Sequence, residues 1–379
     1  MIIKNAIQAE ALIRHFDVTG KLLSVEVEGN GFINDTFVVT FADSTRHSRV
    51  VLQRVNQNVF ARPQDVMNNL RIISSHCLAR LDDEADGAKH HWKVAQIIKT
   101  KAGNDFHVDE GGRVWRCLTY IDDACAYNQV QGLDHAEECG LTLGHFLRLV
   151  SDLDPDRLTK TIPGYHEPSA YLQVYDAVVD HLSADRPDRL DDPEVGRLMS
   201  FVSKRREKLC ELDHAMERGE LKRRVAHGDP RINNILISNE TGKGVAMIDL
   251  DTCAPGLIQM DIGDAARSIC NPSGEDYESL KDVRFEVDVF RAFMRGFWSE
   301  ASAFLTETDA RYIYQAVWTL PVELGLRFLT DHLNGNVYFK VQNANQNLRR
   351  AIGQFHLCEQ MERNEPLIRE VLEEVTGVH

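Results

Sequence analysis

The sequence lacks paired cysteines and long apolar runs. Its 8 cysteines are scattered without a Cys-x-x-Cys pair, which argues against a zinc site or disulfide framework and favours a reducing compartment. No run of apolar residues approaches the ~18 that a membrane helix needs. The segment from Met1 to Phe16 has neither a continuous apolar core nor a small-residue cleavage site. We therefore expect a cytoplasmic protein without a signal peptide or membrane partner.

An excess of basic residues is also missing. Lys and Arg number 43 against 58 Asp and Glu, a formal net charge of −15, whereas binding to a nucleic-acid backbone calls for a basic face. Hydrophobic residues make up 43% of the chain, which is enough for sizeable cores. The 379 residues, without internal repeats, therefore predict two domains and no nucleic-acid partner.

The first third of the chain is typical of a small sheet with one long helix. A short helix is expected over 5–16, and apolar residues at helical spacing predict a long amphipathic helix over Gln64–Leu81. The polar segment 82–92 is expected to be a surface loop. Alternating or continuous apolar residues predict strands at 23–27, 36–41, 49–55, 94–98, 105–108 and 113–120.

The pattern changes after residue 122. Helical periodicity predicts helices at 136–151, 170–183, 194–218, 285–303, 310–333 and 345–376. The polar stretches 184–192 and 271–281 are expected to be loops. Strands followed by helices indicate an α+β protein with two lobes. We expect a mainly antiparallel N-terminal lobe over 1–120, a hinge at about 117–122, and a larger helical lobe over 123–379.

Oxygen-bearing side chains gather in the stretch from Val225 to Arg267. Asp229 and Asn234 are five residues apart in a segment that must be a loop, because Pro230 disfavours a helix at the preceding residue. Asn234 opens an apolar run that turns back at residues 242–244, which predicts a hairpin ending at Asp249 and Asp251. An Asp in a fixed loop can deprotonate a hydroxyl, and an amide with a carboxylate suits Mg²⁺.

This spacing is that of a phosphoryl-transfer site. The protein-kinase catalytic loop places a base Asp five residues before a metal-binding Asn, with a further metal-binding Asp after a hairpin. Asp249 alone could simply cap a turn, but its combination with Asp229 and Asn234 favours catalysis. The Gly29–Thr36 segment is a hairpin whose tip could cover phosphates, although a Gly-x-Gly turn is by itself a weak signal.

These residues resemble the aminoglycoside phosphotransferase and choline kinase superfamily, which has the protein-kinase-like fold. The resemblance rests on His227-Gly228-Asp229 with Asn234, and on Ile248-Asp249-Leu250-Asp251 with Asp261. Stretches outside this region extend it over nearly the whole chain, and the closest match is to the N-acetylhexosamine 1-kinases. It implies an ATP- and Mg²⁺-dependent kinase whose sugar acceptor is phosphorylated at its anomeric hydroxyl.

The resemblance also implies a role for each matching residue. Asp229 would be the catalytic base, Asn234 and Asp249 would hold Mg²⁺, and the first lobe would bind ATP. The sugar would contact Asp251, Arg327 and Tyr338. The residues implied for the nucleotide are Gly31, Phe32, Asn34 and Thr36 over the phosphates, Gln53 on the third strand, and Cys117, Thr119 and Tyr120 near the adenine.

One departure from protein kinases leaves alternatives open. Gln53 stands where the third strand of those enzymes carries a phosphate-binding Lys, so the phosphate ligand is not identified. The acceptor could be another small alcohol, such as an aminoglycoside, choline or homoserine, although Arg327 would repel a cationic acceptor. The chain could also be a non-catalytic nucleotide-binding regulator. Arg327 could instead pair structurally with a carboxylate, and Tyr338 could be a core residue.

Overall fold

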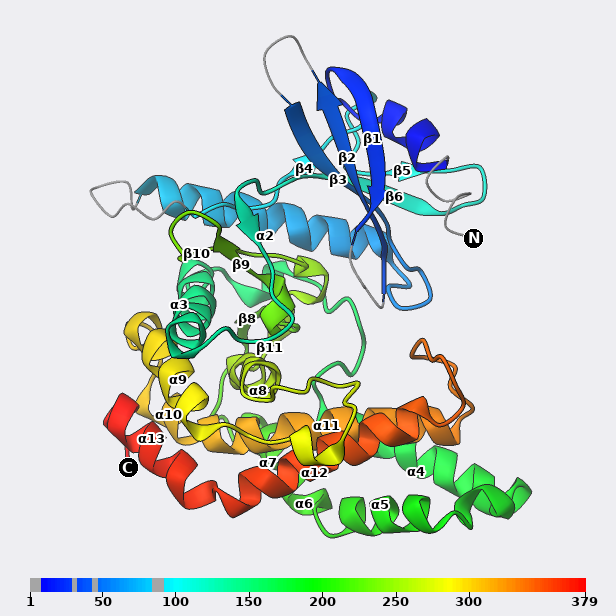
Figure 1. The fold of residues 1–379 in the computed structure, drawn as a ribbon, viewed down its shortest axis with the longest axis vertical. Coiled ribbons are helices and arrows are strands. Elements are labelled where there is room, and N and C mark those ends of the chain that lie inside the picture. Colours follow the sequence, from blue (N-terminus) through cyan, green and yellow to red (C-terminus); the bar gives the residue numbers. More distant parts are fainter. Residues whose placement is uncertain (1–7, 29–32, 43–46, 84–91) are drawn as a thin grey trace.

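The computed structural model describes residues 8–28, 33–42, 47–83 and 92–379. Gly31 and Phe32, with the tip of the expected phosphate hairpin, lie outside the described residues. The same holds for most of the expected loop 82–92 and for the start of the helix expected over 5–16, of which residues 8–12 are helical. Figure 1 traces the chain from the small sheet to the large group of helices.

The N-terminal sheet is antiparallel throughout its described strands. Its order is β1-β2-β3-β6-β4, and β5 pairs with β6. The predicted strands are all present, but those expected at 94–98 and 105–108 are reduced to two-residue pairings. The bounds are β1 (Lys21–Val27), β2 (Asp35–Ala42), β3 (His47–Arg54), β4 (Ile97–Ile98), β5 (His107–Val108) and β6 (Val114–Thr119).

The long helix α2 (Pro63–Asp83) lies between this sheet and the rest of the molecule, as Figure 1 shows. Leu70, Ile73 and Cys77 from its buried face join the main core of the helical lobe. Asn69 is fully buried, and its Nδ2 donates to the carbonyl oxygen of Cys253 over 3.0 Å. The helix predicted at 64–81 is confirmed, and it connects the sheet to the catalytic region.

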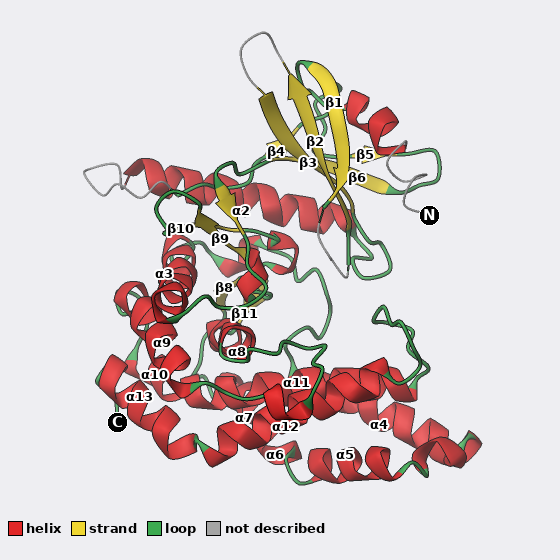
Figure 2. Cartoon of the chain, viewed as in Figure 1, coloured by secondary structure: helices red, strands yellow, loops and turns green. Residues whose placement is uncertain are grey.

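The second part of the chain is helical, as the red elements of Figure 2 show. The α+β class and the small antiparallel lobe with a larger helical lobe are confirmed. The bounds are α3 (Leu133–Leu149), α4 (Pro168–Asp185), α5 (Pro193–Ser203), α6 (Arg206–Leu209), α7 (Glu211–Glu217), α8 (Ile258–Ile269), α9 (Val287–Ala301), α10 (Glu307–Arg311), α11 (Ile313–Leu333), α12 (Gln346–Arg363) and α13 (Glu365–Thr376).

Several helix boundaries differ from the prediction. The single helix expected at 194–218 is α5, α6 and α7, because apolar spacing continues across breaks at Arg205 and Cys210. The helix expected at 345–376 breaks at Asn364, since Pro366 starts α13 and cannot continue α12. The loop expected at 184–192 contains a 3-10 turn, and α8 was not among the predicted helices.

Helices α3 and α9 pack with their backbones in contact. A Cβ atom on Gly140 would lie 1.9 Å from the carbonyl oxygen of Phe293, and one on Gly296 would lie 1.8 Å from that of Glu137. Only glycine fits at either position. This tight pair supports β10 and the hairpin that carries the candidate site, because Lys243 and Gly244 at the start of β10 both bond to Glu138 of α3.

Two short sheets carry the catalytic stretch. The predicted hairpin is confirmed as β9 (Ile235–Ser238) and β10 (Gly244–Met247), with β7 (Ala124–Cys125) paired to β9. Strand β8 (Arg224–Ala226) pairs with β11 (Ala254–Gly256), so the segments before Asp229 and after Asp251 lie side by side. Among the described residues, no helix is long and apolar enough to cross a membrane.

Candidate active site

A cavity of about 120 Å³ collects side chains from both lobes. It is walled by the two residues before β2, by the predicted catalytic loop (residues 227–234), and by α11 with the loop that follows it. Six residues singled out in the sequence line this one cavity: Asn34, Asp229, Asp249, Asp251, Arg327 and Tyr338. The structure therefore brings residues from Asn34 to Tyr338 together, although most of the chain separates them.

The peptide bond before Asp229 is held by two hydrogen bonds. The Asp229 N–H donates to Nδ1 of His227 over 3.2 Å, and the Gly228 carbonyl accepts from Nε2 of His166 over 2.8 Å. Gly228 has a φ of +83°, and a Cβ there would meet the Thr252 carbonyl oxygen at 2.8 Å. The loop therefore turns at a glycine before presenting Asp229.

The His227 imidazole is neutral. Its Nε2 faces the carbonyl oxygen of Ile248 at 3.0 Å and must donate, whereas its Nδ1 accepts from the Asp229 N–H. Burial disfavours the charged ring and lowers the pKa of His227 to about 4, despite the nearby Asp229. His227 thus joins the catalytic loop to the residue before Asp249.

Asp261 on α8 supports the same loop from behind. Its carboxylate accepts from the backbone N–H of His227 at 2.6 Å and of Gly228 at 2.8 Å. Burial raises the pKa of Asp261 to about 7, and the two backbone donors oppose that rise. Helix α8 therefore positions the loop through an acid rather than through apolar contact alone.

Arg231 forms an ion pair with Asp229 that the sequence did not predict. Its Nε and Nη2 donate to the two carboxylate oxygens of Asp229 over 2.6 and 3.0 Å. Burial by itself would raise the pKa of Asp229, but the Arg231 charge and hydrogen bond lower it to about 2. Asp229 is therefore ionised at neutral pH. The sequence feature from which this ion pair could have been predicted is the two-residue spacing of these oppositely charged residues.

Asn234 and Asp249, the residues predicted to bind Mg²⁺, carry the oxygen ligands that a hard cation prefers. The Asn234 Nδ2 donates to the backbone carbonyl of Asp229 at 2.7 Å, and no described residue donates to the side-chain oxygen of Asn234. Asp249 faces the cleft in a left-handed turn with φ of 60°. Burial, followed by the charges of Asp251 and Asp229, raises the pKa of Asp249 to about 7. A bound Mg²⁺ would offset the repulsion between the negative charges of Asp249, Asp251 and Asp229.

No cluster of three or more His, Cys, Asp or Glu side chains has metal-binding geometry within the described ranges. An amide and a carboxylate nevertheless fit Mg²⁺ that shares its shell with water and phosphates, because this ion rarely takes an all-protein cage. Asn234 and Asp249 would hold it, and the ion would neutralise phosphate charge.

A row of side chains crosses the N-terminal sheet toward the same region. Thr36, Gln53 and Arg116 are register partners on β2, β3 and β6, so they point to one face. The Gln53 Nε2 donates to the Thr36 hydroxyl at 3.0 Å, and its Oε1 accepts from Nε and Nη2 of Arg116 at 2.9 and 2.7 Å. Gln53 therefore holds Arg116 in place.

Arg116 is a buried cation of the N-terminal lobe. It is 1% exposed, and its Nη1 lies 2.5 Å from Oδ1 of Asp251. The other oxygen of Asp251 accepts from Nδ2 of Asn34 over 2.8 Å. The sequence assigned no role to Arg116, whose contacts follow from its cross-strand pairing with Gln53. Arg54 points away and pairs with Asp35.

The residues expected near the adenine lie on and just after β6. Cys117 is fully buried between Leu52 and Ile98 in the sheet. The N–H of Thr119 donates to the carbonyl oxygen of Gln96, and the guanidinium of Arg49 lies 4.1 Å from the ring centre of Tyr120. Their contact with a nucleotide stays a prediction.

Arg327 lies among aromatic rings on the opposite wall of the cavity. Its guanidinium carbon is 5.1 to 5.9 Å from the ring centres of Tyr165, Tyr171, Tyr338 and Phe339. Within the described part of the chain, no carboxylate forms an ion pair with Arg327. The alternative of a structural Arg–carboxylate pair is therefore wrong for these residues.

Tyr338 stands on a loop that Asp331 organises. The Asp331 carboxylate accepts from the backbone N–H of Val337, Tyr338 and Phe339 at 2.9, 2.8 and 3.0 Å. Tyr338 is 43% exposed and lines the cavity, so the alternative that it belongs to the core is wrong. One buried acid thus sets the conformation of the loop that faces Asp229.

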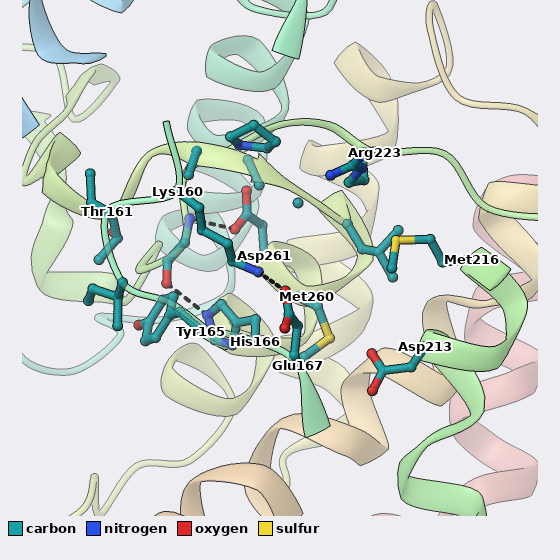
Figure 3. A pocket seen from close by; sticks show the side chains of 18 residues that line it. Lys160, Thr161, Tyr165, His166, Glu167, Asp213, Met216, Arg223, Met260 and Asp261 are labelled. Carbon is teal, nitrogen blue, oxygen red and sulfur yellow. Dashed lines mark hydrogen bonds and ion pairs between the residues drawn. The ribbon is translucent and has the colours of Figure 1, made fainter. Parts of the chain in front are cut away.

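A second, smaller pocket of about 50 Å³ lies behind the catalytic loop. Figure 3 shows Lys160, Glu167 and Asp261 around it, with Lys160 paired to Glu167. Tyr165 and His166 line both this pocket and the main cavity. The segment that carries them therefore forms a wall between the two spaces.

The fold and the site define the class of protein: a two-lobed, protein-kinase-like phosphotransferase that acts on an alcohol group of a small molecule. Residues 25–293 match the model of the phosphotransferase enzyme family. The chain belongs to this family.

Solved structures share the fold at low identity. A microcompartment-associated aminopropanol kinase is 18% identical with a TM-score of 0.61, over 95% of this chain and 97% of that one. A choline kinase from Cryptosporidium parvum Iowa II is 14% identical with a TM-score of 0.58, over 98% and 99%. A spectinomycin phosphotransferase in complex with ADP and spectinomycin is 14% identical with a TM-score of 0.52, over 98% of each chain.

Proposed function

We propose that the protein transfers the γ-phosphoryl group of ATP to a sugar hydroxyl with the aid of Mg²⁺. The anomeric hydroxyl of an N-acetylhexosamine is the first candidate acceptor, giving a sugar 1-phosphate. The observation that carries this proposal is one cavity lined both by the ionised Asp229 and by Arg327, which forms no ion pair with any described residue.

The nucleotide is proposed to occupy the side of the cavity toward the sheet. The spectinomycin phosphotransferase of the same fold is known with ADP. Here the residues from Asn34 and Thr36 to Cys117, Thr119 and Tyr120 would form that side, within a lobe proposed to span 1–120. Gln53 and Arg116 together replace the single strand lysine, so a buried cation is retained.

The acceptor is proposed to lie against Arg327 and Tyr338. A guanidinium ringed by aromatic side chains repels a quaternary or primary ammonium, but it donates hydrogen bonds to neutral oxygens. A sugar offers such oxygens and apolar ring faces that stack on tyrosine. This chemistry supports a neutral polyol over choline or an aminoglycoside. Asp251 would contact only an edge of the sugar, because this residue is 2% exposed and its side chain forms an ion pair with Arg116.

The proposed transfer uses few protein groups. The acceptor hydroxyl donates to Asp229, its oxygen bonds to the γ-phosphorus, and the bond from phosphorus to the β–γ bridging oxygen breaks, releasing ADP. The hydroxyl proton passes to the carboxylate of Asp229. Arg231 holds both oxygens of Asp229 and must release one of them to the acceptor. Mg²⁺ on Asn234 and Asp249 would neutralise the phosphates.

The test is ATP turnover with a panel of acceptors. N-acetylglucosamine and N-acetylgalactosamine are expected to be phosphorylated, whereas choline, aminopropanol, homoserine and an aminoglycoside are not. EDTA is expected to abolish the turnover and Mg²⁺ to restore it. Phosphorylation of an amine alcohol without any sugar turnover would overturn the acceptor assignment.

Two variants separate catalysis from binding. Asp229→Asn should lower kcat by ~10²–10⁴-fold while retaining ADP binding, because only the proton acceptor is lost. Asp185→Asn, a surface acid at the end of α4, is the matched control and should leave kcat unchanged. Wild-type turnover by the Asp229→Asn enzyme would show that Asp229 is not the catalytic base.

Arg327→Met tests the acceptor site. This variant should raise the KM for the sugar more than it lowers kcat.

A second candidate is an amine alcohol. The fold is shared with an aminopropanol kinase and a choline kinase, whose names state cationic acceptors. Acidic residues also line the cavity, among them Glu275 and Glu323. Arg327 decides between the two candidates: if an amine alcohol is the acceptor, Arg327→Met should improve its KM.

A further inference from the structure

Each ring nitrogen of His166 has a hydrogen-bond partner. Its Nε2 lies 2.8 Å from the Gly228 carbonyl oxygen, which can only accept, so this nitrogen carries a hydrogen. Its Nδ1 lies 2.9 Å from Oε1 of Glu323, so one further proton is shared by the ring and the carboxylate. Although burial opposes the charge, Glu323 raises the pKa of His166, and Asp264 on α8 acts in the same direction.

The Glu323–His166 pair connects the acceptor wall to the catalytic loop. Glu323 is 1% exposed on α11, four residues before Arg327, and it lines the main cavity. Gly228 immediately precedes Asp229. Since Asp261 accepts from the Gly228 N–H and His166 donates to its carbonyl, both polar groups of this residue are held. Figure 3 shows His166 beside Tyr165, with a dashed line to the catalytic loop.

His166 adopts an unfavourable backbone conformation to make this contact. Its φ is 53°, in the left-handed region that non-glycine residues rarely occupy. Its ring stays against that of Tyr165 at a centroid distance of 4.2 Å. Such conformations persist where surrounding interactions over-determine them, and they cluster at functional sites.

We propose that His166, held by Glu323, is a positioning residue that sets Asp229 relative to the acceptor. The inference rests on the role of Asp229 proposed above. The His166 ring carries no proton to or from substrate; it fixes the Gly228–Asp229 peptide against α11. Acceptor binding at Arg327 and the orientation of the base therefore depend on one helix.

His166→Phe tests the link, because it keeps a ring against Tyr165 but removes both hydrogen bonds. A displaced catalytic group costs on the order of tenfold to a hundredfold in rate, so kcat should fall by about that factor. The Kd for ADP measured without Mg²⁺ should not change, since the contacts proposed for the nucleotide itself lie in the other lobe. Amide hydrogen exchange over 225–234 should accelerate, which is a readout independent of the acceptor.

His76→Phe is the matched control. His76 makes a histidine–carboxylate contact of the same length, 2.9 Å to Asp152, on α2 and away from the cavity. This variant should leave kcat and the exchange of 225–234 unchanged. Equal effects of the two substitutions would assign the His166 result to the general loss of a histidine pair and overturn the proposal.

The double variant His166→Phe/Glu323→Leu separates positioning from stability. Replacing both buried partners by apolar groups is nearly neutral for folding, whereas leaving Glu323 unpaired is not. The double variant should recover the Tm lost by His166→Phe and keep the low kcat and rapid exchange. Recovery of kcat together with Tm would show a purely structural role.

Asp229→Asn in the same assays distinguishes the two proposals. If Asp229→Asn keeps the wild-type turnover, Asp229 is not the catalytic base, and the proposal that His166 positions that base is refuted as well. If Asp229→Asn is inactive while His166→Phe has wild-type kcat and wild-type exchange, only the positioning role fails. If none of the acceptors is phosphorylated, the rate of ATP hydrolysis by water is compared between the variants instead.

Discussion

Replacing Arg116 by Met probes the buried pair between the lobes. The guanidinium is 1% exposed and contacts Gln53 by two hydrogen bonds and Asp251 at 2.5 Å. Met carries no charge, so among the described residues the buried carboxylate of Asp251 keeps only the hydrogen bond from Asn34. The substitution therefore leaves a buried carboxylate without its cation.

The expected cost follows from that unpaired charge. Removing one partner of a buried ion pair destabilises a protein by ~3–5 kcal/mol, a large part of the ~5–15 kcal/mol that holds a typical domain folded. Arg113→Met is the matched control, at the residue that immediately precedes the same strand. The side chain of its partner Asp109 is 8% exposed, but that of Arg113 is 40% exposed, so solvent screens the pair and we expect a loss of about 1 kcal/mol or less.

Urea unfolding and nucleotide titration measure the effect. Arg116→Met should lower the free energy of unfolding by several times the loss in Arg113→Met. Arg116→Met/Asp251→Asn should recover much of it, because the unpaired charge is gone. ADP affinity should fall in both Arg116 variants if the cation faces the phosphates. Equal losses for Arg116→Met and Arg113→Met, without recovery in the double variant, would refute this reasoning.

Three further outcomes are expected. Asp331→Asn presents an amide to three backbone donors and should raise the acceptor KM about tenfold or more with little change in kcat, measured by steady-state kinetics. Since the folded pKa of His227, about 4, is below its unfolded value, its contribution is intact above pH 6.5 and lost toward pH 4. The wild type should therefore lose ~3 kcal/mol more than His227→Asn over that range in urea titrations. Gly140→Ala should cost at least ~3 kcal/mol in the same measurement, or prevent folding, because its Cβ would meet a backbone oxygen; an unchanged midpoint would contradict the packing.

The order of strands and helices could be read from apolar periodicity, because each element buries one face. Boundaries failed where that periodicity continued through a break, as at Arg205 and Cys210 between α5 and α7. Helix α8 was missed because its buried face carries Asp261 and Asp264, which read as polar in sequence although both are buried.

The sequence by itself determined the class of reaction. Asp229, Asn234, Asp249 and Asp251 occupy one loop and the hairpin that follows, so their spacing along the chain already encodes their arrangement. A hairpin of such short strands has few alternative registers once its apolar face is buried, which is why local spacing was sufficient.

Only the tertiary structure decided which groups hold these residues in place. His166 and Glu323 are 157 residues apart, and Asn34 is 217 residues from Asp251. Arg116 meets Gln53 through strand register, and Arg327 is left among rings because no described carboxylate reaches it. Such contacts depend on how helices and strands pack, and no periodicity along the chain reports which polar groups burial will bring together.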